Sequence, residues 1–305
     1  MPISLTERKA SRTLCWSVLL LSGIIYGSSF SWMKIAVEGG AHPLGMVFWF
    51  ALIATLILTA EIGARGKLRC IELRNLNFCI PWAILSVISP NLLFFYAAIE
   101  IQPSIIAIGI ALVPMITLLG ATFLRRETLT ARRSVGLALG AIGIGMILLP
   151  KTSLPDAKDT LFVLIAFAGA ACYAAEHLYI EVKLPDDIAI DQLLLIMFMS
   201  ATIMLIPAVF LTGTFFVPSW PLGPPEFAIV SVAGVTLLDY FLITLLIVWA
   251  GPVFTSQAAY IVTIAGVVWG VVIFDDDLSM WVWSALVIIM CGLAFVRPRE
   301  ARQNG

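Results

Sequence analysis

Residues 103–123 read PSIIAIGIALVPMITLLGATF, a run of 21 residues in which no side chain carries a charge. A helix needs about 20 predominantly apolar residues to cross the hydrocarbon core of a bilayer, and this run has that length. Its ends are marked, because Gln102 and Pro103 open it and Arg125 and Arg126 follow shortly after it. The stretch therefore predicts a transmembrane helix.

The composition of the whole chain supports the same interpretation. Of its 305 residues, 61% are hydrophobic and 12% are charged, whereas soluble domains are roughly 25% charged. So few charges cannot cover the surface of a water-soluble protein of this length. The composition excludes a soluble enzyme, a nucleic-acid-binding protein and a secreted disulfide scaffold. The five cysteines show no zinc-like spacing, and we expect neither a metal nor a cofactor.

Other apolar windows, bounded by charge, Pro or Gly, predict further spans. The ten windows are residues 14–33, 43–62, 77–98, 103–123, 133–149, 160–180, 191–212, 226–248, 252–273 and 280–296. We therefore expect an all-α membrane protein with ten transmembrane helices, embedded in the lipid bilayer and lacking a soluble domain.

The basic residues are unevenly divided between the two sides of the membrane that ten spans create. Fifteen of the 18 lysines and arginines fall on the side that holds both chain ends, and only Lys34, Lys151 and Lys158 fall on the other. Cytoplasmic loops carry an excess of Lys and Arg. We therefore expect a multi-pass protein of the cell (inner) membrane with both termini in the cytoplasm.

The second half of the sequence repeats landmarks of the first at a spacing of 149 residues. Lys34 aligns with Lys183, Pro103 with Pro252, Gly143 with Gly292, and residues 127–130 with residues 276–279. Five spans are an odd number, so a second set of five must enter the membrane from the opposite side. We expect two inverted five-helix repeats, residues 1–150 and 151–305.

Two stretches give the chain a resemblance to a known family. Residues 26–34 (YGSSFSWMK) are similar to a family segment W-G-S-S-F-x-x-x-K. Residues 114–143, which contain Arg126-Glu-Thr-Leu-Thr130, are similar to its pattern P-x-x-x-x-L…G-E-x-L-T…G-x-x-L-I-x-x-G. With its five-plus-five spans, the chain resembles the EamA family of the drug/metabolite transporter superfamily. It departs from the family pattern at Tyr26, which is usually Trp, and at Arg126, which is usually Gly.

The resemblance implies a small-metabolite transporter that works by alternating access, most often an exporter or exchanger of amino acids or related metabolites. Uptake of a cationic amine or a quaternary ammonium nutrient of the choline type is the alternative. Either function uses a small-molecule substrate driven by its own gradient, by exchange or by protons, because the sequence has no nucleotide-binding motif. We expect a monomer or a weak homo-oligomer and no enzymatic activity.

Ionisable residues inside predicted spans are the first candidates for a functional site, because a charge at membrane depth is costly without a partner. Asp239 lies near the middle of window 226–248, and Glu176 and His177 lie along window 160–180. These three residues are also candidates for proton coupling. In the alternative interpretation, Asp239 only hydrogen-bonds a Ser or Thr on a neighbouring helix, and Glu176 snorkels toward the cytoplasm.

Aromatic and polar side chains near these acids extend the candidate site. Tyr173, Glu176 and Tyr179 share one helical stripe, and Tyr240 neighbours Asp239. A carboxylate beside aromatic faces favours a cation, although Tyr is also common as a packing or interfacial residue. Lys34 binds either a solute carboxylate or lipid headgroups. The full set of predicted substrate-binding residues is Glu176, Asp239, Tyr173, Tyr179, Tyr240, Asn91, Tyr260, Gln257 and Lys34.

A membrane-embedded enzyme of the prenyltransferase type is the remote alternative. Asp186, Asp187 and Asp191 form one acidic string and residues 275–277 form another, and paired aspartates of this kind hold Mg²⁺ for diphosphate substrates. The predicted topology places the two strings on opposite sides of the membrane, so they cannot share a site.

Overall fold

The computed structural model describes residues 11–66, 75–148, 157–185, 190–250, 252–255 and 257–296. Within these ranges the regular structure is helical, and no strand occurs. The elements in order are α1 (Arg12–Gly27), α2 (Ser29–Glu38), α3 (Pro43–Ala64), α4 (Leu76–Ala83), the π-helical turn η3 (Ile84–Ile88), α5 (Ser89–Glu100), α6 (Pro103–Ile110), α7 (Val113–Phe123), α8 (Ala131–Leu148), α9 (Ala157–Lys183), α10 (Ile190–Leu211), α11 (Pro224–Ala250), α12 (Pro252–Thr255), α13 (Ala258–Phe274) and α14 (Met280–Val296).

Eight helical stretches in these ranges are long and apolar enough to cross a membrane. They are Arg12–Glu38, Pro43–Ala64, Leu76–Glu100, Pro103–Phe123, Ala131–Leu148, Asp159–Ile180, Ile190–Leu211 and Pro224–Ile243. The helices α13 and α14 are apolar too, but each has only 17 residues. The predicted all-α, multi-pass membrane protein is confirmed, and eight of the ten windows coincide with these stretches.

Several of these stretches are interrupted near the middle. Ser28 separates α1 from α2, η3 lies between α4 and α5, and residues 111–112 separate α6 from α7. Pro90 and Pro114 lie at two of the interruptions, and proline has no N–H to donate to the carbonyl four residues earlier. Such breaks are tolerated in a membrane where other groups satisfy the freed carbonyls.

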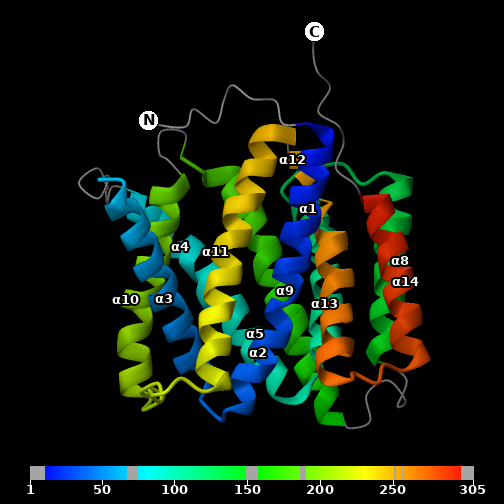
Figure 1. Cartoon of the computed structure of the whole chain (residues 1–305). Helices are drawn as coiled ribbons and strands as arrows, with labels where there is room; N and C mark the ends of the chain where they lie inside the picture. The colour runs from blue at the N-terminus through cyan, green and yellow to red at the C-terminus, as the bar shows by residue number, and fades with distance from the viewer. Residues whose placement is uncertain are drawn as a thin grey trace.

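The helices stand side by side in a bundle, with α3 and α10 at one edge and α8 and α14 at the other (Figure 1). The largest contacts join elements from the two halves of the chain. Thus α8 packs on α14, α3 on α10, α5 on α9, and α6 on α13, while α1 packs on both α11 and α13. The interior of the bundle is therefore the interface between the two halves.

Glycines allow the closest of these approaches. A Cβ added to Gly136 of α8 would lie 2.7 Å from the carbonyl oxygen of Gly292 in α14, and one added to Gly292 would lie 2.8 Å from the Gly136 oxygen. Gly27 of α1 meets the backbone nitrogen of Gly266 in α13 in the same way, at 2.8 Å. Small residues that let backbones touch are the usual means of packing helices in lipid.

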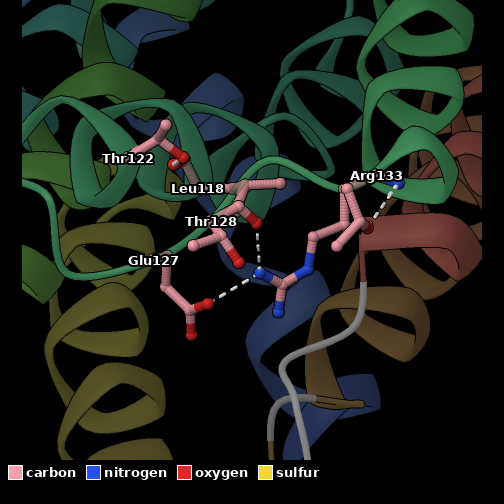
Figure 2. Close-up of polar contacts among 6 residues, drawn as sticks. Leu118, Thr122, Glu127, Thr128 and Arg133 are labelled. Carbon is pink, nitrogen blue, oxygen red and sulfur yellow. Dashed lines mark hydrogen bonds and ion pairs between the residues drawn. The ribbon is translucent and has the colours of Figure 1, made fainter.

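The link between α7 and α8 contains the Glu127-Thr-Leu-Thr130 motif, and Figure 2 shows how this link is held. Arg133, only 5% exposed, donates to Glu127 Oε2 at 2.7 Å and to the Thr128 carbonyl at 3.1 Å (Figure 2). The Thr130 hydroxyl accepts from the backbone N–H of Arg133 at 3.4 Å, which satisfies a donor at the start of α8. The motif therefore stabilises the beginning of α8.

The contact between α8 and α14 gives a direct test of the packing. We expect Gly136→Ala to destabilise the protein by about 1–3 kcal/mol, because the new methyl group meets backbone that cannot move aside. Gly234→Ala in α11 is the matched control, since a Cβ there has nothing within 4 Å. Melting in detergent should show a lower midpoint for the first variant only, and equal midpoints would contradict this packing.

Candidate functional site

Glu176 of α9 and Asp239 of α11 lie against polar groups that come from the first half of the chain. The Trp82 indole in α4 donates to Glu176 Oε1 at 2.8 Å, and the Ser22 hydroxyl in α1 donates to Asp239 Oδ1 at 2.5 Å. Glu176 is 5% exposed, whereas Asp239 is partly buried. Both acids therefore sit at the interface between the halves and accept from neutral donors.

Three tyrosines surround these two carboxylates. The hydroxyls of Tyr26 and Tyr173 share a hydrogen bond of 3.2 Å, and that of Tyr240 shares one of 2.7 Å with Ser86. Ser86 also lies close to the side chain of Glu176.

Two of the tyrosines link the surroundings of the two acids. Tyr26 and Tyr240 each lie in the neighbourhood of both Asp239 and Glu176. We call the set Ser22, Tyr26, Trp82, Ser86, Tyr173, Glu176, Asp239 and Tyr240 the central cluster. Its members come from α1, α4, η3, α9 and α11, which correspond to the first, third, sixth and eighth predicted spans.

The π-helical turn η3 places Ser86 in this cluster. Pro90 cannot donate to the Ser86 carbonyl, and the Asn91 side-chain amide donates to it instead at 3.2 Å, and to the Val87 carbonyl at 2.9 Å. A π-turn widens a helix locally and is frequent at functional sites. Asn91, predicted to bind substrate, therefore supports the backbone behind Ser86.

Tyr179 lies outside the central cluster, toward the end of α9. Its ring stacks on Phe78 with centroids 5.3 Å apart, and its hydroxyl donates to the Phe78 carbonyl at 3.2 Å. His177 is exposed and no contact found in the described chain links it to Glu176, as expected for neighbours about 100° apart on a helix. Tyr179 is thus connected to Glu176 through Phe78 and Trp82, whereas no described contact connects His177 to either acid.

Lys34 is also remote from the central cluster. Its ammonium donates to the carbonyls of Ala98 at 2.8 Å and Ile99 at 3.3 Å, near the end of α5. The last carbonyls of a helix lack helical partners, and a lysine near them compensates both the missing donors and the helix dipole. The position of Lys34 is thus explained by its hydrogen bonds to the last carbonyls of α5.

Tyr260 and Gln257 lie at the start of α13. The Tyr260 hydroxyl is buried and has no hydrogen-bond partner in the part of the chain that the structure covers, and Gln257 precedes the helix without capping it. No contact described for either residue joins it to the two acids.

The described members of the two acidic strings lie far apart. Asp186 and Asp187 lie outside the described residues, and Asp191 begins α10 with Arg65 3.8 Å away. Asp276 follows α13 and accepts from the Ser104 hydroxyl at 2.5 Å, at the start of α6. The start of α10 and the end of α13 lie at opposite ends of the bundle (Figure 1).

A helical, multi-pass bundle with polar side chains gathered between its halves has the architecture of a membrane transport protein. Residues 13–149 match the model of the EamA-like transporter family. The first half of the chain is thus similar to this family, which is part of the drug/metabolite transporter superfamily. The resemblance of the two sequence stretches is thereby confirmed.

Two further comparisons concern the whole chain. No curated protein matches the sequence. A solved structure titled "Crystal structure of protein" superposes with a TM-score of 0.59 at 15% identity, over 93% of this chain and 96% of the other. At that identity the likeness shows a shared fold and nothing about the solute.

The support behind Ser86 can be tested by a double-mutant cycle. Asn91→Leu should destabilise the protein by about 1–3 kcal/mol, because it removes the donor to the Ser86 carbonyl. In a Pro90→Ala background, residue 90 can donate its own N–H, and the same substitution should cost less. Equal costs in the two backgrounds, measured by melting in detergent, would show that the amide does not replace the missing proline donor.

Proposed function

We propose that the protein is a small-solute transporter of the cell (inner) membrane that works by alternating access around the central cluster. The observation that carries this proposal is that Glu176 and Asp239 of the second half accept hydrogen bonds from Trp82 and Ser22 of the first half. Tyr26, also of the first half, lies near both acids. Transporters built from two halves place their solute between them near the middle of the bilayer.

In this proposal the chain crosses the membrane ten times. The two short helices, α13 and α14, complete the set of spans, and α12 (Pro252–Thr255) precedes α13 in the ninth. A 17-residue helix is about 25 Å long, slightly short of a bilayer core, and such a mismatch is accommodated by local thinning or by flanking residues.

The contacts support two inverted repeats, residues 1–150 and 151–305. If each span is equivalent to the span five positions later, α8 corresponds to α14, α3 to α10 and α6 to α13. The two members of each of these pairs are in contact. The packing of α1 and α2 on α11 has its counterpart in that of α5 on α9. Likewise, the packing of α1 on α13 corresponds to the packing of α9 on α6 and α7. A two-fold relation between the halves accounts for all of these pairs.

We place both chain ends in the cytoplasm because of the basic residues. The start of α1, the end of α3, both ends of the α7–α8 link and the end of α9 share one face of the bundle (Figure 1). That face carries Arg12, Arg65, Arg125, Arg126, Arg132, Arg133 and Lys183, as the positive-inside rule requires of a cytoplasmic surface.

The family and the site give two classes of solute. Amino acids or related metabolites, exported or exchanged, follow from the resemblance, and a cationic amine or quaternary ammonium follows from the acids and tyrosines. Either solute moves without a cofactor, as a monomer or a weak homo-oligomer. Glu176 and Asp239 are also the proposed sites of proton coupling, with His177 outside the cluster.

The orientation makes a labelling prediction. In a cysteine-free background, Lys183→Cys should react with a membrane-impermeant thiol reagent only from the cytoplasmic side, and Asp277→Cys, which is exposed in the turn before α14, only from the opposite side. Inside-out and right-side-out vesicles give the two measurements. Labelling of both cysteines from one side would disprove the ten-span arrangement.

Transport itself depends on the two carboxylates in this proposal. In proteoliposomes offered a panel of labelled amino acids and amines, Glu176→Gln and Asp239→Asn should each lower counterflow about tenfold or more. Glu61→Gln is the matched control, because this half-exposed acid near the end of α3 pairs with Arg65 outside the cluster. Flux at the wild-type level in both test variants would refute the proposed site.

A further inference from the structure

The central cluster contains two carboxylates and no positive charge to balance them. Glu176 accepts from an indole N–H and Asp239 from a serine hydroxyl, both of which are neutral. No basic side chain that the structure describes pairs with either acid. The ion pairs it does show, those of Arg65 and Arg133, lie at the basic face of the bundle.

This imbalance has a consequence for the solute. Charge at membrane depth without a counter-charge is unfavourable, so a proton or a bound cation must neutralise each acid. A solute that brings a positive charge is attracted strongly, because the low dielectric there screens little. A solute carboxylate would add a third acidic group to a cluster without a basic side chain, and Lys34, the basic residue predicted to receive it, is bonded to the end of α5 instead.

The aromatic residues beside the acids favour an organic cation over a bare metal ion. Tyr26, Tyr173 and Tyr240 lie around the acids, and Trp82 touches Glu176. Aromatic faces attract ammonium groups and also cover their apolar substituents. Metal ions prefer several oxygen ligands from acidic or carbonyl groups, and the described residues contain no group of three or more acidic, His or Cys side chains that could hold one.

An unsatisfied hydroxyl gives independent support for a ligand at this place. Ser29 is 1% exposed, and its hydroxyl has no hydrogen-bond partner in the described ranges. It follows Ser22 by seven residues and Tyr26 by three, and Ser28 between them keeps helical dihedral angles of −70° and −18°. Ser29 therefore lies on the same face of the span as the two residues that reach the acids. A buried hydroxyl without a partner is unfavourable, and a ligand group can supply the missing bond.

We propose that the transported solute is an organic cation, an amine or a quaternary ammonium ion, held between Glu176 and Asp239 and against the rings of Tyr26, Tyr173 and Tyr240. The solute, with its single positive charge, displaces one proton or one other monovalent cation when it binds, so that the net charge of the site does not change. This assignment rests on the proposed transport function and narrows it to one class of substrate.

Three probes with one scaffold and different charges test the assignment. They are 2-phenylethylammonium, a cation, L-phenylalanine, a zwitterion, and 3-phenylpropionate, an anion. A further comparison uses choline, a quaternary ammonium ion, and its neutral isostere 3,3-dimethylbutan-1-ol. Titration calorimetry on the purified full chain in detergent measures binding, and counterflow in proteoliposomes measures transport of the same compounds.

We expect 2-phenylethylammonium or choline to bind, and the zwitterion, the anion and the neutral isostere to bind at least tenfold more weakly. Glu176→Gln and Asp239→Asn should each weaken binding of the cation roughly 30-fold or more, as when one partner of a buried charge pair is removed. Because the two acids are on different helices, one variant remains informative if the other fails to fold. Glu61→Gln should leave the dissociation constant unchanged.

The outcomes separate this inference from the transport function. Binding and counterflow of L-phenylalanine without either cation would overturn the cation assignment and leave the protein a transporter. Cation binding that both variants leave intact would also overturn it, as would the absence of cation binding at millimolar concentration. Cation binding that the variants abolish supports the assignment even without vesicle flux, and in that case the transport function would be wrong.

Discussion

A carboxylate at membrane depth needs hydrogen-bond donors or a counter-charge, because the hydrocarbon around the protein offers neither. Glu176 and Asp239 belong to the second half of the chain, and their donors, Trp82 and Ser22, belong to the first. This requirement joins α9 to α4 and α11 to α1 at the middle of the bundle. Breaking either contact would leave an acid without a partner, so the polar centre fixes how the two halves meet.

The outer part of the bundle is held by different means. Between α8 and α14, and between α1 and α13, glycines bring backbones into direct contact, and between α1 and α13 the Trp269 indole also donates to the Ile24 carbonyl. Packing of this kind has little freedom to adjust, because any added atom collides with a carbonyl or an amide. The central contacts are side-chain hydrogen bonds, which can exchange partners when a solute or proton arrives. A site that must open and close is better built from side-chain hydrogen bonds than from glycine contacts.

Much of this arrangement could be predicted from the sequence. Long apolar windows such as 103–123 and 191–212 agree closely with Pro103–Phe123 and Ile190–Leu211, because span length is set by the bilayer. Glu176 and Asp239 were recognisable because acids inside apolar runs are rare. Trp82 and Ser86 were missed, since a Trp and a Ser in an apolar span look like packing residues until a tertiary partner is known.

Other roles depended on contacts between distant segments. No local pattern connects Lys34 with the carbonyl of Ala98, or Tyr179 with the ring of Phe78. The helical stripe predicts correctly that Tyr179 and Glu176 face the same way, since both contact α4, but they lie about one turn apart, Glu176 against Trp82 and Tyr179 against Phe78.

The central claim is that Glu176 and Asp239 act on one solute in one site. The most direct measurement is the coupling energy between Glu176→Gln and Asp239→Asn in solute binding, from the dissociation constants of both single variants and the double variant. We expect a coupling of about 1 kcal/mol or more, because the acids share tyrosines and, in this account, a ligand. Additivity within about 0.5 kcal/mol would mean independent sites and would contradict the account.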